Sequence, residues 1–464
     1  MRVAAIDQGT TSTRCLVVED DGKWSIADNR RHAQHYPAPG WVEHDPEELL
    51  RNVVSVLQAA GPVDVIGIAN QGESCLAWDG QTGAALSPVI VWQDTRTVDS
   101  LGELDHSAEE RSKKVCGLPL DPYFSASKLA WLIKNIPAVA SAHSAGRLRL
   151  GTTDSFFLDR LCGSFATDLA TASRTGLLDL RTGGWSREMC DLHGVPFECL
   201  PAISTVDGGF GKIGNTPVKA SIVDQQSALY GHNCRNPGDC KITFGTGAFL
   251  LAISGTERPQ DSKLIPTIAW HRVGEVPTYA IEGGVYDAGG ALEWASRIGL
   301  FSAPGDFEAF EGPSALSRGI IFVPALSGLA APYWDRRAAP LFIGMDHATD
   351  RRDMVRAVLE GIAMLTVGVI EAASEATNRG TSISIDGGLS QSSYFVQFLA
   401  SASNRTITVP SMHEVTALGL AELCGADVGS TRSASRVFTP VGSVSEDDHR
   451  RFARAIERAR GWKA

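Results

Sequence analysis

A short apolar hairpin pattern that occurs twice is the feature that most constrains how this chain folds. Residues 2–6 form an apolar run, a turn rich in glycine and threonine follows at 8–11, and a second apolar run occupies 15–20. Residues 241–244 lead in the same way into Gly245-Thr246-Gly247, and the run AFLLAI follows. Apolar runs that flank such a turn are typical of β-hairpins. The repetition predicts an internal duplication that divides the chain nearly in half.

Length and turn signals agree with a division into two domains. A single hydrophobic core rarely extends beyond about 250–300 residues, and the chain has 464. The turn Asn236-Pro237-Gly238 falls between the two hairpin patterns. We therefore expect an N-terminal domain over 1–228 and a C-terminal domain over 229–464. Because strand and helix signals are interspersed throughout, we expect an α/β architecture.

Capping residues mark the starts of two helices. Asp45 precedes a proline and two glutamates, which is typical of a helix start, and the apolar stripe that follows ends at Gly61-Pro62. The next run, 63–70, is a candidate buried strand. Farther along, we expect Asp353 to cap a long apolar helix over 354–376.

Composition excludes several classes of partner. Lys and Arg number 42 and Asp and Glu number 53, for a net charge of −11, so we expect no basic face for duplex nucleic acid or anionic lipid. We also expect no membrane span, because no uninterrupted apolar run approaches about 18 residues. The N-terminus has no signal-peptide pattern, and the nine cysteines are scattered. These features predict a cytoplasmic protein with reduced thiols.

The first turn has the composition of a phosphate-binding loop. Consecutive small residues let backbone N–H groups converge on one point, and the hydroxyls of Thr10, Thr11 and Ser12 add donors. Asp7 precedes the turn, where a carboxylate can hold Mg²⁺, and Arg14 can pair with the same anion. Taken alone, the segment is equally consistent with a surface hairpin.

Two further turns strengthen the nucleotide hypothesis. A triphosphate held between two domains needs a cradle from each, and Thr246 lies in the second turn. Residues 382–385 form a predicted strand that leads into Asp386-Gly387-Gly388, where the absence of Cβ atoms would let a flat ring approach the backbone. Together the three turns favour nucleotide binding over coincidence.

Two other phosphate motifs are absent or out of context. The sequence contains no G-x-x-x-x-G-K-[ST], which excludes a P-loop enzyme. A G-x-G-x-x-G occurs at 209–214, but Asn215-Thr216-Pro217 follows and no βαβ unit surrounds it. We interpret it as a glycine-rich loop, which argues against a nicotinamide-dependent oxidoreductase.

Asp224 ends a short apolar stretch and begins the run DQQSALYG. A carboxylate at a strand end in a cleft can accept the proton of an attacking hydroxyl. The same position also suits an N-cap for the helix that follows. From the residues alone, the cap is slightly favoured.

Nine ordered segments identify a resemblance to the FGGY carbohydrate kinases, and the chain is most similar to the members that phosphorylate glycerol. The segments run in family order over nearly the whole chain: DQGTTSTR at 7–14, PGWVEHDP at 39–46, VWQDTRT at 91–97, DPYFSASKLAWLI at 121–133, DQQSALYG at 224–231, FGTGAFL at 244–250, GLAAPYWD at 328–335, DGGLSQS at 386–392 and EVTALG at 414–419.

The resemblance implies an actin/Hsp70-like (ribonuclease H-like) fold, in which two lobes, each a mixed sheet with helices, close over ATP and substrate. Asp224 would be the general base, and Asp7 would position Mg²⁺. Carried over residue by residue, the phosphates would contact Thr10, Thr11, Ser12, Arg14 and Thr246, and the nucleoside would lie near Gly289, Glu293, Gly388 and Ser392. The acceptor would contact Gly72, Glu73, Tyr123, Asp224 and Gln225, between apolar walls from Trp92 and Phe249. The family often has Gln and Asn in place of Glu293 and Ser392.

One departure concerns the acceptor. In the similar kinases an arginine that donates to substrate hydroxyls occupies the position of Gly72, just before Glu73. Losing that donor would cost roughly 1.5–3 kcal/mol of binding, and the vacated volume could hold a larger molecule. We expect glycerol or a related small polyol as the acceptor, with a four- or five-carbon sugar alcohol or ketose as the alternative.

Two expectations complete the prediction. The protein is expected to form a homo-oligomer, either a dimer or a tetramer. A non-catalytic ATP-binding module of the same fold is the alternative from another functional class, and the acceptor-side residues Glu73, Trp92, Tyr123 and Phe249 argue against it.

Overall fold

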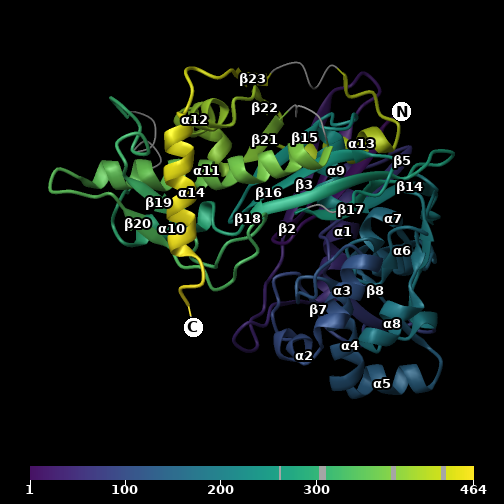
Figure 1. The fold of residues 1–464 in the computed structure, drawn as a ribbon. Helices are drawn as coiled ribbons and strands as arrows, with labels where there is room; N and C mark the ends of the chain where they lie inside the picture. Colours follow the sequence, from purple (N-terminus) through teal and green to yellow (C-terminus); the bar gives the residue numbers. More distant parts are fainter. Residues whose placement is uncertain (261–262, 303–309, 378–382, 430–434, 464) are drawn as a thin grey trace.

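Two mixed β-sheets, one in each half of the chain, form the centres of two lobes (Figure 1). The structure is a computed structural model that describes residues 1–260, 263–302, 310–377, 383–429 and 435–463. Residue 382, the first of the strand predicted over 382–385, lies outside the described residues. The sheets position the two glycine-threonine turns.

The first sheet has the strand order β13-β14-β5-β1-β2-β3. Strands β1 and β2 are antiparallel, β5 is parallel to β1, and β14 is parallel to β5. Its strands are β1 (Val3–Gln8), β2 (Ser12–Val18), β3 (Trp24–Arg31), β5 (Val65–Asn70), β13 (Lys212–Ile213) and β14 (Thr216–Val223).

The second sheet has the order β17-β18-β16-β15-β21-β22-β23. Here β15 and β16 are antiparallel, β21 is parallel to β15, and β22 is parallel to β21. Its strands are β15 (Cys240–Phe244), β16 (Ala248–Gly255), β17 (Ile265–Trp270), β18 (Thr278–Val285), β21 (Ile383–Gly387), β22 (Ile407–Pro410) and β23 (Ser435–Phe438).

The predicted internal duplication is present in the topology. Each sheet is built around an antiparallel hairpin, and the hairpin's first strand pairs in parallel with a strand from later in the same lobe. The turn of each hairpin is the predicted glycine-threonine segment, closed by the Gly9 N–H to the Ser12 carbonyl at 3.0 Å and by the Gly245 N–H to the Gly247 carbonyl at 2.8 Å.

A four-stranded sheet and several helices complete the first lobe. This sheet has the order β4-β7-β6-β8. Its strands are β4 (Glu43–His44), β6 (Cys75–Asp79), β7 (Val89–Ile90) and β8 (Leu148–Thr152). The helices are α1 (Pro46–Ala60), α2 (Val98–Gly102), α3 (His106–Val115), α4 (Ser125–Asn135), α5 (Pro137–Ser144), α6 (Thr153–Cys162), α7 (Leu169–Ala172), α8 (Arg187–His193) and η1 (Phe197–Cys199). Short strands are β9 (Ala166–Asp168), β10 (Leu178–Asp179), β11 (Gly184–Trp185) and β12 (Ala202–Ser204). The predicted helix after Asp45 is confirmed, and the Asp45 side chain accepts the Glu47 N–H.

The second lobe surrounds one long helix, α11 (Arg351–Thr377). Its other elements are α10 (Gly289–Arg297), β19 (Ile321–Val323), β20 (Leu341–Ile343), η3 (Gly388–Gln391), α12 (Ser393–Ser403) and α14 (Glu446–Ala459). By length and composition alone α11 could cross a membrane, but 83% of its most apolar window is buried inside the protein, as in the core helix of a globular domain.

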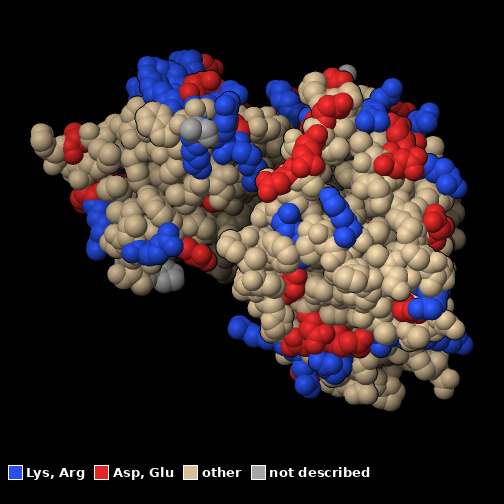
Figure 2. All heavy atoms as spheres, turned by 90° about the horizontal axis from the view of Figure 1, so that it is seen from below, with Lys and Arg blue, Asp and Glu red and all other residues tan. Residues whose placement is uncertain are grey.

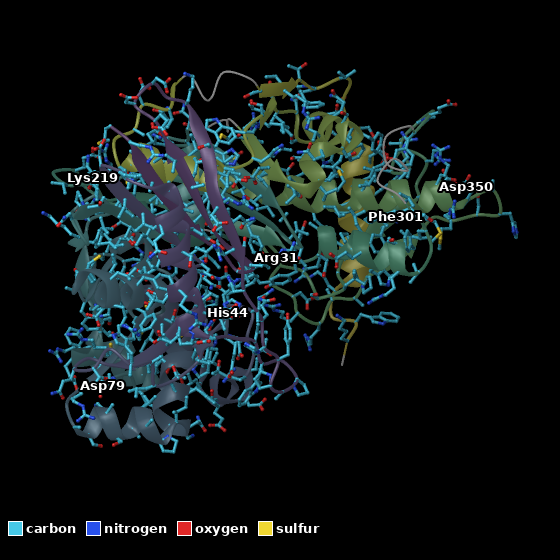
Figure 3. All side chains as sticks on the ribbon, turned by 180° about the vertical axis from the view of Figure 1, so that it is seen from behind. Arg31, His44, Asp79, Lys219, Phe301 and Asp350 are labelled. Atoms are coloured by element: carbon cyan, nitrogen blue, oxygen red, sulfur yellow. The ribbon has the colours of Figure 1, made fainter. Side chains whose placement is uncertain are left out.

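The predicted cap of this long helix is wrong. Asp353 lies within the first turn of α11, and its own N–H donates to Asp350 Oδ1 at 2.9 Å. Asp350, labelled at the outer end of the second lobe in Figure 3, therefore takes the capping role. The Asp353 carboxylate pairs with Arg318 and also accepts the Asp350 N–H at 3.2 Å. Two aspartates three residues apart cannot be ranked as caps from their spacing alone.

Helix α9 (Asp224–Gly231) crosses α13 (Val415–Leu423) at very short range. A Cβ at Gly419 would lie 2.0 Å from the Ser227 carbonyl oxygen and 2.5 Å from the Gly231 nitrogen, so the crossing requires glycine. Residues of α13 also belong to the core around β1 and β5, which means that the C-terminal half returns one helix to the first lobe. The predicted boundary after residue 228 falls inside α9.

The segment 209–214 does not open a helix, as predicted, but it includes the short strand β13. Its residues Lys212 and Ile213 form β13, the first strand of a short hairpin with β14, and no helix begins there. Gly209, Gly211 and Gly214 all have positive φ, between 62° and 95°. These glycines serve backbone turns.

Candidate active site

A cavity of about 80 Å³ lies between the lobes. All seven residues that the sequence assigned to the acceptor line it, and both lobes contribute. The lining consists of Thr10, Gly72, Glu73, Trp92, Tyr123, Arg174, Val223, Asp224, Gln225, Gln226, Phe249, Leu251 and Glu282. The structure thus brings together residues that are separated by more than half of the chain.

Asp224 is the first residue of α9, and Val223 occupies the N-cap position. The Asp224 Oδ1 accepts the N–H of its neighbour Gln225 at 2.6 Å. An N-cap side chain accepts from a residue two or three positions farther on, so Asp224 does not act as the cap. Its other oxygen, Oδ2, has no hydrogen bond within the described part of the chain and is available to a ligand.

The surroundings of Asp224 raise its pKa to about 8. Burial is the largest cause, and the carboxylates of Asp7 and Glu73 add to it, while Lys241 acts in the opposite direction. A carboxyl whose pKa lies near neutral pH, in a cleft and close to other acids, is characteristic of a proton-transfer site.

Lys241 is a residue that the sequence reasoning missed. It lies on β15, is fully buried, and donates from Nζ to Gln225 Oε1 and, at 3.0 Å, to Thr243 Oγ1. Burial lowers its pKa, opposed by the nearby carboxylates of Asp386 and Asp224. It joins the second sheet to the residue after the candidate base. Its sequence signal is a single charge inside the otherwise uncharged strand CKITF.

Aromatic side chains form one wall of the cavity. The rings of Trp92 and Tyr123 meet edge to face with their centroids 5.6 Å apart. Trp92 Nε1 donates to Thr10 Oγ1 at 2.9 Å. This bond ties the acceptor wall directly to the first glycine-threonine turn, so the two sites share one rigid frame.

The space beside Gly72 is not empty. A Cβ at position 72 would lie 2.9 Å from Val223 Cγ2, so the valine fills the volume that a side chain there would need. The Val223 side chain thus lies where the first carbon of a side chain at position 72 would be. The next residue, Glu73, is held at φ 58°, an uncommon conformation for a residue with a side chain.

Arg174 and Glu282 also line the cavity, and the sequence reasoning singled out neither. Arg174 Nε donates to Glu73 Oε1 at 2.7 Å, and its NH1 lies 2.7 Å from Glu282 Oε2. Arg174 is an isolated charge in the weakly polar segment ATASRTGLL. A single charge in such a segment is the sequence signal that could have identified Arg174 as a site residue.

The first turn carries a carboxylate and a guanidinium on neighbouring strands. Asp7 on β1 is directly opposite Arg14 on β2. The pKa of Asp7 is raised to about 6, chiefly by burial and then by Glu414, with Arg14 opposing. Arg14 NH1 pairs with Glu414. Thr11 is exposed, and Ser12 is half-buried.

The second turn packs tightly against α10. The Thr246 carbonyl accepts the N–H groups of Ala288 and Gly290, each at 2.9 Å. A Cβ at Gly289 would lie 2.5 Å from the Gly245 carbonyl oxygen, so glycine is required there. Glu293 lies on the same helix with its side chain exposed.

The two glycines at the end of β21, Gly387 and Gly388, have different roles. A Cβ at Gly387 would lie 2.2 Å from the Phe244 carbonyl oxygen, so this glycine is needed for packing. Gly388 faces open space, with no atom within 4 Å of a Cβ built there. Ser392 is buried, and its Oγ accepts the Phe395 N–H at 3.3 Å as the cap of α12. Of these two glycines, Gly388 is the one that offers the open backbone that a ring would need.

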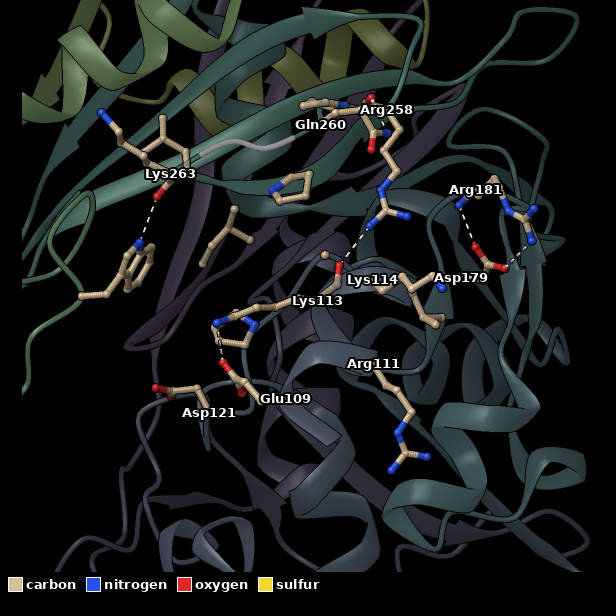
Figure 4. A pocket seen from close by; sticks show the side chains of 18 of the residues that line it. Glu109, Arg111, Lys113, Lys114, Asp121, Asp179, Arg181, Arg258, Gln260 and Lys263 are labelled. Carbon is tan, nitrogen blue, oxygen red and sulfur yellow. Dashed lines mark hydrogen bonds and ion pairs between the residues drawn. The ribbon is translucent and has the colours of Figure 1, made fainter. Parts of the chain in front are cut away.

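A larger hollow of about 1550 Å³ lies elsewhere between α3 and the segments around Arg258 and Trp334. Figure 4 shows Arg258 reaching across it to the Lys113 carbonyl, at 3.0 Å. It contains none of the predicted site residues. Seen from below in Figure 2, side chains of both signs occur on both lobes, with an indentation between them.

Comparisons with known proteins cover the whole chain. Residues 2–231 and 240–427 match the models of the N-terminal and C-terminal domains of the FGGY family of carbohydrate kinases. A glycerol kinase of Aromatoleum aromaticum is 38% identical over 496 residues, with 99% of each chain covered. A glycerol kinase of Symbiobacterium thermophilum is 37% identical, covering 100% of this chain and 99% of the relative.

A solved structure agrees with the fold. The crystal structure of Plasmodium falciparum glycerol kinase with ADP superimposes with a TM-score of 0.88 at 30% identity, covering 99% of this chain and 98% of that one. The two-lobed fold expected from the sequence is confirmed.

Proposed function

Because the chain belongs to the FGGY family of carbohydrate kinases and is an ATP-dependent kinase, we propose that its acceptor is glycerol. The observation that carries the proposal is the small cavity between the lobes, which the acceptor-side residues line together with Asp224. The full-length similarity to kinases named for glycerol supports the same acceptor.

The residues can perform phosphoryl transfer as follows. Asp224 accepts the proton of one acceptor hydroxyl while that oxygen attacks the γ-phosphorus of ATP and the bond to ADP breaks. Glu73 and Gln225 orient the remaining hydroxyls, and Trp92 and Phe249 exclude water, the competing acceptor. Since phosphoryl transfer requires little covalent work from the protein, positioning and charge neutralisation provide most of the catalysis.

We propose Asp7 as the residue that holds Mg²⁺ beside the phosphates. Its carboxylate offers the hard oxygen ligands that Mg²⁺ prefers. The pKa of Asp7 is raised chiefly by burial and then by the Glu414 carboxylate, and the Arg14 guanidinium opposes this shift only in part. When bound, the ion would neutralise charge on the phosphate oxygens. Thr10, Ser12 and Thr246 lie in the two turns that would donate to those oxygens.

The alternative acceptors are less well supported. A four- or five-carbon polyol or ketose would have to fit in a cavity of about 80 Å³. A non-catalytic ATP-binding module would have no use for a polar cavity with a carboxylate directed into it.

An ADP-release screen tests the proposal directly. Glycerol, erythritol, ribitol, xylitol, xylulose and ribulose are compared by kcat/KM, and glycerol is expected to give the highest value. A higher kcat/KM for a larger compound would identify that compound, and not glycerol, as the acceptor. ATP hydrolysis that no polyol stimulates would instead support the non-catalytic module.

We also propose a cytoplasmic homo-oligomer. All nine cysteines are free thiols, and eight of them are buried, which suits a reducing compartment.

At the edge of the second sheet, β23 exposes Val437, and an exposed edge strand is available for pairing between copies of the chain. Light scattering after size exclusion distinguishes a dimer or a tetramer from a monomer.

A further inference from the structure

We propose that Arg174 donates a hydrogen bond to an acceptor hydroxyl and so determines which polyol the enzyme selects, in place of a side chain at position 72. The inference rests on the proposed function, because it concerns the same acceptor cavity. Arg174 comes from the segment after α7, far in sequence from Gly72, and it enters the cavity from another wall.

Two carboxylates hold the guanidinium in place. Nε donates to Glu73 Oε1 at 2.7 Å, and NH1 lies 2.7 Å from Glu282 Oε2. The Arg174 side chain is 3% exposed, and all three residues line the cavity. A buried cation between two anions has a fixed orientation, which is a requirement for selective recognition.

The guanidinium retains unused donors. Arginine carries five N–H groups, and the bond to Glu73 uses one. NH1 is buried and has no hydrogen-bond partner of good geometry in the described part of the chain, although it lies within ion-pair distance of Glu282. Because NH1 is already in ion-pair contact with Glu282, the donors left for a hydroxyl are the remaining N–H groups of the guanidinium, which lines the cavity.

The backbone at Glu73 supports a ligand-binding role. Glu73 has φ 58°, and its carbonyl accepts the Ser125 hydroxyl at 2.9 Å. Residues held in such uncommon conformations are concentrated at ligand sites. The conformation fixes the carboxylate that in turn orients Arg174.

The test compares Arg174→Lys with the wild type on glycerol and on two diols that each lack one hydroxyl, 1,2-propanediol and 1,3-propanediol. Arg174→Lys keeps the charge that balances Glu73 and Glu282 but loses the forked geometry. We expect kcat/KM for glycerol to fall by about ten- to hundredfold, mainly through KM. For the diol that lacks the contacted hydroxyl, kcat/KM should change by less than about twofold.

A purely structural role predicts a different pattern. If Arg174 only balances buried charge, the substitution lowers kcat/KM by the same factor for glycerol and for both diols, and that result would overturn the inference. Arg96→Lys is the matched control, because Arg96 is equally buried between two carboxylates, Asp94 and Glu43, but does not line the cavity. It should leave the ratio of glycerol to diol activity unchanged.

A second variant tests the inference if Arg174→Lys does not fold. Glu282→Gln keeps Arg174 and removes one of the charges that orient it, so a loss for glycerol that spares one diol supports the inference and a uniform loss opposes it. Melting temperatures are recorded for every variant. If wild-type enzyme does not phosphorylate glycerol, the proposed function fails by itself, and the comparison is made with the best acceptor of the screen and its deoxy derivatives.

Discussion

At the residue scale, the assignment of Asp224 as the general base gives the most direct prediction. Asp224→Asn removes the proton acceptor but keeps the side-chain volume. We expect kcat to fall by about 10²–10⁴-fold, the range typical of general-base catalysis, with ATP affinity retained because the phosphate turns are untouched. Steady-state kinetics and ATP titration measure both quantities. Turnover close to wild type would remove Asp224 from the mechanism.

The effect of a side chain at position 72 depends on its neighbour Val223. Because Val223 fills the space next to Gly72, Gly72→Arg alone should overpack the site and cost about 1–3 kcal/mol of folding stability. Replacing the valine in Gly72→Arg/Val223→Gly should recover the melting temperature and lower the KM for glycerol. If the single variant melts like the wild type, the valine does not restrict the pocket.

At the element scale, the crossing of α9 and α13 holds the base in place. Gly419→Ala would place a methyl group 2.0 Å from the Ser227 carbonyl, so the helices must separate. We expect a loss of at least about 1–3 kcal/mol and reduced kcat, since α9 carries Asp224. Thermal unfolding and kinetics measure these effects.

Gly102→Ala, in helix α2, is the control for the Gly419→Ala substitution. Gly102 has open space around a built Cβ and no positive φ, so its substitution should leave both quantities near wild type. Equal melting temperatures for the two alanine variants would show that the helices are not limited by the glycine contact.

At the scale of the whole molecule, buried acids make stability depend on pH. The pKa of Asp224 is about 8 in the folded protein, against 3.8 for the unperturbed group. The folded state thus binds more protons between these values, and stability falls as pH rises through that window. Without ligands, the melting temperature of wild type relative to Asp224→Asn should decrease from about pH 4 to pH 8. Parallel curves for the two proteins would contradict the raised pKa.

Much of the fold could be predicted because its signals are local. The two hairpins, the Asp45 cap and the glycine-rich loop at 209–214 each depend on neighbouring residues whose sterics and hydrogen bonds are readable in order. The acceptor-side residues came from motif resemblance, and the structure gathers all seven in one cavity. The cap of α11 was assigned to the wrong aspartate because two candidates satisfied the same local rule.

By itself, the sequence determined the duplicated hairpins, the α/β class and the segments from which the site is built, because turn sterics and apolar alternation act over a few residues. Only the tertiary structure decided that Val223 fills the space beside Gly72, that Lys241 contacts Gln225, and that Arg174 lies between Glu73 and Glu282. Which charges become neighbours, and how much water is removed from them, depends on how distant elements pack, and that packing leaves no short-range trace in the order of the residues.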